Sequence, residues 1–173
     1  MRRVRWRGVV LTLAHVVVSA VCGAQAPDAT ASLQVFGQAD FAWPLLTLRG
    51  ERLSLSAFRG SVIVINSWAT WCEPCVAELR SLAALRAAVP DTDVVFVLVA
   101  PQRREPVQQF VRRRGLSLPV YLEGAPVPSA FGFEAVPTTW IINRTGAIVL
   151  RHRGAARWDL PATIAFLSAL RAR

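Results

Sequence analysis

Two cysteines separated by two residues, Cys72 and Cys75, are the side chains of this sequence best suited to chemistry. Thiols at this spacing can form and break a disulfide with little movement of the backbone. The pair lies in the segment Trp71-Cys-Glu-Pro-Cys75. Thiol–disulfide exchange is therefore the leading hypothesis, with the Cys72–Cys75 disulfide itself as the redox group and no added cofactor or metal.

The flanking residues predict where the cysteines lie. Residues 61–66, Ser-Val-Ile-Val-Ile-Asn, form a β-branched apolar run that is typical of a buried strand. Beyond the cysteines the apolar spacing becomes helical. We therefore expect a turn from strand to helix, with Cys72 at the start of the helix and Cys75 one turn in. The apolar residues that set this helical spacing are Val76, Leu79, Leu82 and Leu85.

This position gives the two thiols different expected roles. The N-terminus of a helix carries partial positive charge and free amide donors, which stabilise a thiolate and lower its pKa. Cys72 is thus expected to attack a partner disulfide, and the deeper Cys75 to resolve the mixed disulfide. Pro74 suits the first turn of the helix, where a missing N–H loses no intrahelical hydrogen bond.

A zinc site is the main alternative use of such a pair. Structural zinc needs four ligands, and the chain offers only Cys22, His15 and His152 besides the pair. Cys22 and His15 lie in a predicted targeting segment. Too few ligands remain, so we expect no metal.

Composition indicates one folded domain. The chain has 173 residues, of which 53% are hydrophobic, enough to fill a core. Its net charge of +9 comes entirely from arginine. No aromatic platform or evenly basic helix accompanies that charge, so we expect no nucleic-acid binding. We expect a monomer.

The first residues indicate export. Arginines within residues 2–7 precede an apolar stretch, residues 9–21, which is shorter than the roughly 18–20 residues that span a bilayer. Small residues at Gly23 and Ala24 permit cleavage. We therefore expect a signal peptide at 1–24, a tether without packed structure at 25–40, a folded domain at 41–173, and a periplasmic location. Lipidation at Cys22 and retention of the segment as a membrane anchor facing the periplasm stay open.

The rest of the chain predicts alternating strands and helices, and thus an α/β fold with a central mixed sheet and helices on both faces. Turn residues such as Gly50 and Gly146 mark two hairpins. The first is the N-terminal hairpin. The expected elements are a hairpin at 45–48 and 52–55, a strand at 93–100, a helix at 105–115, a strand at 118–122, a hairpin at 137–143 and 147–152, and a helix at 159–172.

Three groups of residues together resemble a known family. They are residues 66–75, Asn-Ser-Trp-Ala-Thr-Trp-Cys-Glu-Pro-Cys, then Glu78, and finally residues 135–143, Ala-Val-Pro-Thr-Thr-Trp-Ile-Ile-Asn, with Gly146. Over residues 36–173 the chain resembles the TlpA/ResA-type thioredoxin-like disulfide oxidoreductases of bacterial envelopes. The resemblance implies a thioredoxin-like fold.

The same resemblance implies roles for several residues. Pro137 would be a cis-proline beside the disulfide, and the backbone of Val136 would pair with an incoming substrate chain. Thr138 follows in the same substrate-binding segment. Trp68 and Trp71 are expected to shape the apolar contact surface, and Trp71 to touch substrate. Electrons for a reductant would come from a membrane thiol donor, again by resemblance.

One position departs from cytoplasmic thioredoxin. Asn66 stands where thioredoxin has a buried aspartate, and an amide cannot take a proton. Proton transfer is instead expected from Glu78, one turn beyond Cys75, or from Glu73 between the cysteines. A carboxylate near Cys72 would raise the pKa of that thiol and oppose the helix N-terminus. Glu78 on a solvated helix face is the alternative.

Two further functions are less compatible with the sequence. A thiol peroxidase of the peroxiredoxin type would need Pro-x-x-x-Thr-x-x-Cys, but Ile65 and Ala69 occupy the proline and threonine positions before Cys72. An envelope copper-binding module could use His152 with the cysteines, but such proteins have three residues between their cysteines. Reduction of protein disulfides, in cytochrome c or copper-site maturation for example, is the expected function.

Overall fold

The computed structural model describes residues 34–89, 94–132 and 135–172. The predicted signal peptide and most of the predicted tether lie outside these residues. None of the described helices is long and apolar enough to cross a bilayer.

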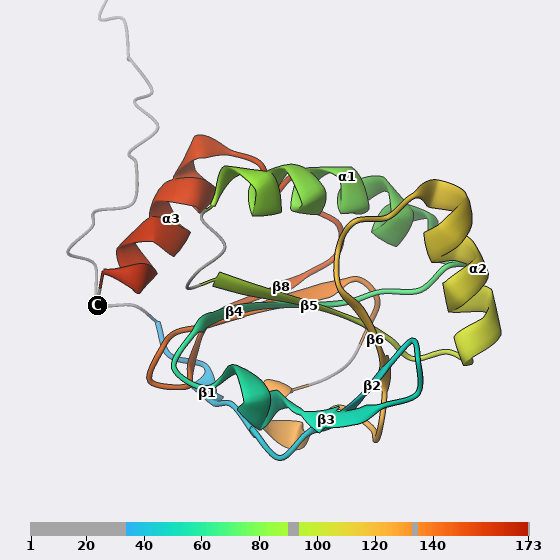
Figure 1. Ribbon diagram of the computed structural model, residues 1–173. Helices are drawn as coiled ribbons and strands as arrows, with labels where there is room; N and C mark the ends of the chain where they lie inside the picture. Colours follow the sequence, from blue (N-terminus) through green and yellow to red (C-terminus); the bar gives the residue numbers. More distant parts are fainter. Residues whose placement is uncertain (1–33, 90–93, 133–134, 173) are drawn as a thin grey trace, which may run out of the picture. The chain divides into compact units, whose positions relative to one another are not determined.

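Eight strands form one mixed sheet in the order β1-β8-β7-β4-β5-β6-β2-β3 (Figure 1). Strands β4, β5 and β6 are parallel, whereas β7 is antiparallel to β4 and β8 is antiparallel to β7. The strands are β1 (Gly37–Gln38), β2 (Pro44–Thr47), β3 (Arg52–Ser54), β4 (Val62–Ser67), β5 (Val94–Ala100), β6 (Val120–Glu123), β7 (Thr138–Ile142) and β8 (Ala147–Arg153).

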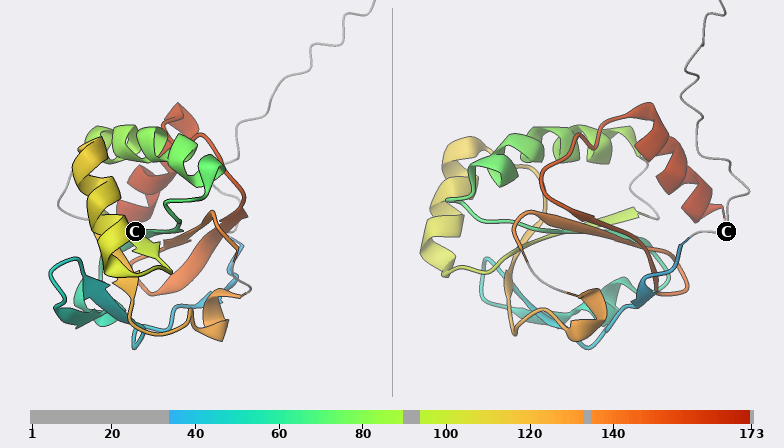
Figure 2. Two further views of the ribbon diagram at one scale, coloured as in Figure 1. Left: turned by 90° about the vertical axis from the view of Figure 1, so that its right-hand side faces the viewer. Right: turned by 180° about the vertical axis from the view of Figure 1, so that it is seen from behind.

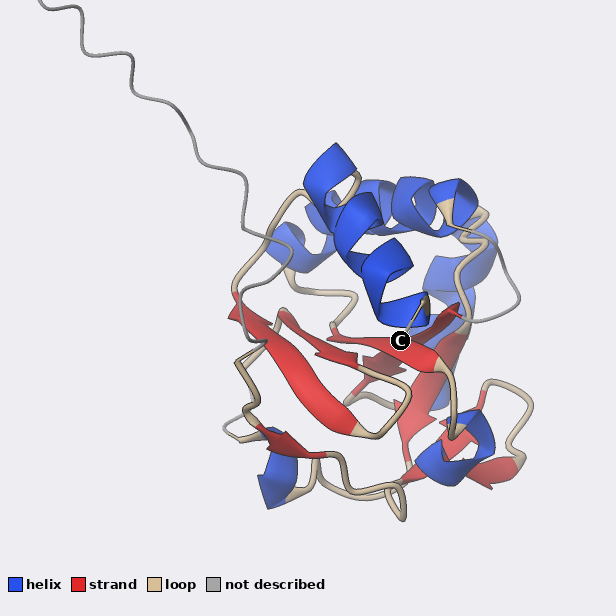
Figure 3. Ribbon diagram, turned by 90° about the vertical axis from the view of Figure 1, so that its left-hand side faces the viewer, coloured by secondary structure: helices blue, strands red, loops and turns tan. Residues whose placement is uncertain are grey.

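Three α-helices pack on one face of this sheet, as the view coloured by secondary structure shows (Figure 3). They are α1 (Glu73–Ala88), α2 (Arg104–Arg114) and α3 (Pro161–Arg171). Val62 and Val64 of β4 point into this helical layer, whose core includes Leu82 of α1, Phe110 of α2 and Leu167 of α3.

The opposite face has a different cover. Ile63 and Ile65 alternate with the two valines of β4 and join a second core cluster built around Trp43 and Phe131. This face is covered by the β2–β3 segment and by two 3₁₀ helices, η1 (Leu55–Phe58) and η2 (Ser129–Phe131), also visible from behind in Figure 2. Helices thus lie on both faces as predicted, but all three α-helices share one face.

Each predicted strand and helix is present, with shifts at the ends. The largest shifts are two residues, at β6, which starts at Val120, and at α3, which starts at Pro161. Residues 37–38, assigned to the tether, form β1 against Ala147 and Ile148, so the folded part begins earlier than residue 41. Backbone pairing creates this strand, and its polar sequence gave no sign of it.

Candidate active site

The Cys72–Cys75 disulfide sits at the turn from β4 into α1, as predicted. Its sulfurs are bonded and its Cα atoms are 5.2 Å apart. Cys72 is the N-cap of α1, and its sulfur accepts a hydrogen bond from the backbone N–H of Cys75 at 3.3 Å. Pro74 lies in the first turn. Cys72 is 6% exposed and Cys75 is fully buried, so an external thiol meets Cys72 first.

The segment before β7 lies at the same end of the sheet. The Val136–Pro137 peptide bond is cis, as the resemblance implied. Thr138 pairs with Ser67 at the end of β4, which brings this segment alongside the start of the cysteine motif. The hydroxyl of Thr138 is buried and donates to the carbonyl oxygen of Ala135 at 2.6 Å. Its side chain therefore shapes the segment and does not face a partner.

The two tryptophans before the motif differ. Trp71 is 70% exposed beside Cys72, as a substrate-contacting residue would be. Trp68 is fully buried, with its ring centroid 5.2 Å from that of Phe110. The expectation that Trp68 shapes the contact surface was therefore wrong, because its indole points into the helical core.

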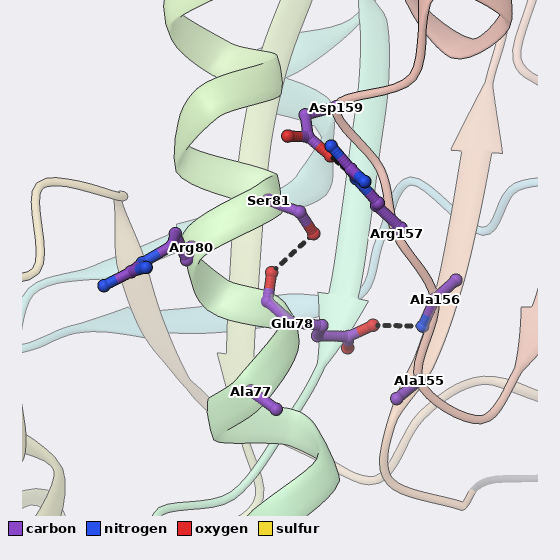
Figure 4. Close-up of a pocket in the computed structure, with 8 residues that line it drawn as sticks. All are labelled: Ala77, Glu78, Arg80, Ser81, Ala155, Ala156, Arg157 and Asp159. Carbon is purple, nitrogen blue, oxygen red and sulfur yellow. Dashed lines mark hydrogen bonds and ion pairs between the residues drawn. The ribbon is translucent and has the colours of Figure 1, made fainter.

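Glu78 is buried, at 3% exposed, so the alternative of a solvated helix face was wrong. Three donors from two segments, β4 and the loop after β8, hold its carboxylate. Asn66 Nδ2 donates to Oε1 at 2.9 Å, while the backbone N–H of Ala156 and Nε1 of Trp158 donate to Oε2 at 3.1 and 3.0 Å. Figure 4 shows the carboxylate turned from α1 toward the loop at Ala156.

The donors around Glu78 are neutral. An ion pair joins Arg157 and Asp159 beside the site, but among the described residues no arginine or histidine pairs with Glu78 within 4 Å. A buried charge without a counterion is stable only if several hydrogen bonds replace its hydration. Each of the three donors therefore matters to this site.

Asn66 connects the carboxylate to the sheet. It is fully buried, and its Nδ2 also donates to Oγ1 of Thr139 at 2.9 Å. Both amide hydrogens are then used. Its Oδ1 has no hydrogen-bond partner among the described residues. Asn66 therefore acts here as a hydrogen-bond donor to the carboxylate. Its amide cannot take a proton itself.

The loop that presents Trp71 is held by a residue that sequence reasoning missed. Gln102, between β5 and α2, accepts from the backbone N–H of Thr70 at 2.7 Å and donates to its Oγ1 at 3.0 Å. A backbone N–H can only donate, so this pair of bonds fixes the orientation of the amide. No local pattern indicated the contact, which spans 32 residues.

An open pocket of about 490 Å³ lies beside Glu78, between α1 and the loop after β8. Small residues line it, and the Arg157–Asp159 ion pair, 2.9 Å long, sits at its edge (Figure 4). The hydrogen bond from Arg157 lowers the pKa of the Asp159 carboxyl. The small lining residues are Ala77, Ser81, Ala155 and Ala156.

Neither Glu73 nor His152 is a donor to the Glu78 carboxylate. Glu73 is exposed in the first turn of α1. His152 is half-buried and meets the Trp158 ring edge-on, with centroids 5.5 Å apart. Among the described residues, no three His, Cys, Asp or Glu side chains form a group that could hold a metal ion.

A mixed sheet with a cysteine pair at the first turn from strand to α-helix, and a cis-proline segment at the adjoining strand end, defines a thioredoxin-like fold with a dithiol–disulfide site. The comparisons agree. The chain belongs to the redoxin family, whose model matches residues 22–165.

Similar proteins and solved structures indicate which kind of redoxin the chain resembles. The chain is 34% identical over 125 residues to the thiol-disulfide oxidoreductase ResA of Halalkalibacterium halodurans, covering 71% of each chain. It is 28% identical over 135 residues to the thioredoxin-like protein YneN of Bacillus subtilis, covering 76% of this chain and 71% of that one. Among solved structures, a DsbE-type thiol:disulfide interchange protein from Chlorobium tepidum matches with a TM-score of 0.68 at 25% identity, covering 80% of this chain and 99% of that one.

Replacing Gln102 with Ala removes both bonds to Thr70. We expect the Thr70 amide to exchange with solvent at least tenfold faster, because the N–H loses its acceptor, while amides in the middle of β5 keep wild-type rates. Hydrogen exchange followed by NMR checks this. An unchanged Thr70 rate would show that the loop is held by other contacts.

Proposed function

We propose that this enzyme works outside the cytoplasm and reduces disulfides in other proteins, with Cys72 as the nucleophile and Cys75 as the resolving thiol. One observation carries the assignment. The sulfur at the helix N-cap is the more accessible one and lies beside the exposed Trp71, while its partner is fully buried beside a buried carboxylate.

The reaction has two exchange steps. The Cys72 thiolate attacks one sulfur of a substrate disulfide, forms a mixed disulfide and releases the first substrate sulfur as a thiolate. Cys75 then loses its proton and attacks the Cys72 sulfur. The new Cys72–Cys75 bond forms, the bond to substrate breaks, and the second substrate sulfur leaves with the electron pair. Two electrons pass from the dithiol to the substrate, so the pair itself is the redox group and no cofactor is needed.

Glu78 is the proposed acceptor of the Cys75 proton. The two residues lie three apart in α1, so their side chains are neighbours on one helix face, and both are buried away from bulk water. A thiol in such a place needs a nearby base before it can attack. Glu73, exposed near Cys72, would tune the attacking thiol, and Pro74 would fix the helix start.

Substrate would bind across the end of the sheet. Trp71 offers an exposed apolar surface next to Cys72, and the half-buried Val136 precedes Pro137 with backbone groups that could pair with an extended chain. Such contacts recognise the substrate backbone and one apolar side chain near its disulfide, which suits protein substrates of differing sequence.

The buried carboxylate favours the reducing direction. A strong oxidant such as DsbA owes its potential to a stabilised reduced form. Here the Glu78 carboxylate, which pairs with no cation among the residues that the structure describes, lies near the pair and disfavours the thiolate of the reduced form. A reductant outside the cytoplasm must be recharged, and a membrane thiol donor would supply the electrons. Disulfides in apocytochrome c or in copper-site proteins are suitable substrates, and a monomer is sufficient for this reaction.

Export rests on the sequence pattern of residues 1–24, with the residues from 25 up to β1 as the tether. Cleavage would release the domain into the periplasm. Retention of residues 1–24, or lipidation at Cys22, would instead keep the same domain on the membrane, facing the periplasm.

The two cysteines should behave differently when replaced. Cys72→Ser removes the attacking thiol, so insulin reduction with dithiothreitol should fall to background. Cys75→Ser keeps the attacker and loses the resolver, so it should accumulate a mixed disulfide with a disulfide-containing protein substrate. Non-reducing electrophoresis and mass spectrometry measure both outcomes. Trapping by Cys72→Ser instead of Cys75→Ser would reverse the assignment.

Glu78→Gln tests the carboxylate. Glutamine can keep the bonds from Ala156 and Trp158 through its oxygen, and the Asn66 amide can turn its unpartnered Oδ1 toward the new NH₂ group. We therefore expect a stability loss of no more than about 1–2 kcal/mol, but a changed pH profile of Cys72 alkylation by iodoacetamide. Urea unfolding measures the first quantity.

Glu78→Ala is the matched control for the fold. It leaves the buried donors of Asn66, Ala156 and Trp158 without their acceptor, so it should destabilise more than Glu78→Gln. Superimposable alkylation profiles for wild type and Glu78→Gln would remove Glu78 from the chemistry.

A further inference from the structure

Trp158 lies in the loop between β8 and α3, outside every motif identified in the sequence. Its indole is 5% exposed, and its Nε1 donates to Oε2 of Glu78 at 3.0 Å across 80 residues of sequence. Trp158 takes no part in the two exchange steps proposed above. Its hydrogen bond nevertheless ends on the carboxylate proposed to take the proton of Cys75.

The two oxygens of Glu78 are used unequally. Oε2 accepts two hydrogen bonds, from the backbone N–H of Ala156 and from Nε1 of Trp158. Oε1 accepts one, from Nδ2 of Asn66. A carboxylate oxygen has about two acceptor positions, so Oε2 is filled and Oε1 keeps one open position. The open position is on the oxygen held by strand β4, and the filled oxygen is the one held by the loop.

We propose that Trp158 is a positioning residue that makes Oε1 the proton-accepting oxygen of Glu78. Its indole N–H, with the Ala156 N–H, saturates Oε2 and fixes the carboxylate against the loop. The proton of the Cys75 thiol then passes to Oε1 as the Cys72–Cys75 bond forms and the substrate sulfur leaves with its electron pair. This inference rests on the proposed function of Glu78.

A second bond in the same loop provides a control. The backbone N–H of Trp158 donates to Oγ of Ser81 at 3.2 Å. Figure 4 shows the next bond, in which Ser81 Oγ donates to the backbone carbonyl of Glu78 at 2.9 Å. Ser81→Ala therefore weakens the attachment of the loop to α1 without touching the carboxylate. Trp158→Phe removes the donor to Oε2 and keeps an aromatic ring in the core and against His152.

Other charged groups around the site stay in place in both variants. His152 meets the Trp158 ring edge-on, while Arg80, Arg157 and Asp159 line the adjoining pocket. In Figure 4 the Arg80 side chain points away from Glu78. A pH effect found only in Trp158→Phe is thus assigned to the lost indole N–H.

The test follows reduced enzyme with the aromatic disulfide DTNB by stopped flow. Attack by Cys72 releases one thionitrobenzoate, and resolution by Cys75 releases a second, so the second phase reports the proton transfer from Cys75. Without the indole donor the carboxylate anion is less stabilised. We expect the pH midpoint of the second phase to rise by about one unit in Trp158→Phe and to match wild type in Ser81→Ala.

Several outcomes overturn the inference. Equal midpoints in Trp158→Phe and wild type, or equal shifts in Trp158→Phe and Ser81→Ala, leave Trp158 as a packing residue. A normal second phase with a pH profile unchanged by Glu78→Gln removes the proposed role of Glu78 and this inference with it. Absence of any second phase in wild type overturns the proposed function itself.

A measurement without substitution covers the case in which Trp158→Phe does not fold. The indole N–H resonance of Trp158 in the wild-type protein should move with pH, with the same midpoint as the second kinetic phase. An indole resonance that does not change across that pH range overturns the inference.

Discussion

The buried carboxylate of Glu78 is the interaction on which the site depends. It lies on α1, and its three donors come from β4 and from the loop after β8, so one side chain joins the helix that carries the cysteines to the sheet and to the loop. At 3% exposure, and with no cation paired to it among the described residues, this carboxylate depends on these donors in place of hydration. The same requirement fixes the positions of Asn66 and Trp158.

Two electrostatic influences meet at the cysteine pair. The N-cap position of Cys72 places its sulfur at the positive end of α1, where a thiolate is stabilised. Glu78, one turn beyond Cys75, acts in the opposite sense. In our account the helix end makes Cys72 the nucleophile, while the carboxylate takes the proton of Cys75 and keeps the pair reducing. The two thiols thus differ in role although only two residues separate them.

Local pattern was sufficient for much of the fold. The β-branched run of β4 and the helical spacing after it placed Cys72 at a helix start. Turn residues located the two hairpins. Each of these features depends on neighbouring residues, so sequence was enough to predict it. The burial of Glu78 also had a signal. Position 78 lies three residues after Cys75 and four before Leu82, on the stripe that faces the core.

Contacts between distant segments could not be predicted. Strand β1 exists because its backbone pairs with β8, and Gln102 and Trp158 reach Thr70 and Glu78 across 32 and 80 residues. Trp68 and Trp71 look equivalent in sequence, yet only the folded chain shows that the first is in the core and the second at the surface.

The reduction potential of the Cys72–Cys75 couple, measured against glutathione in wild type and Glu78→Gln, tests the central claim most directly. Our account predicts a wild-type value near that of thioredoxin, about −270 mV, and a less negative value in the variant. A wild-type value near the about −120 mV of DsbA, or no difference between the two proteins, would contradict it.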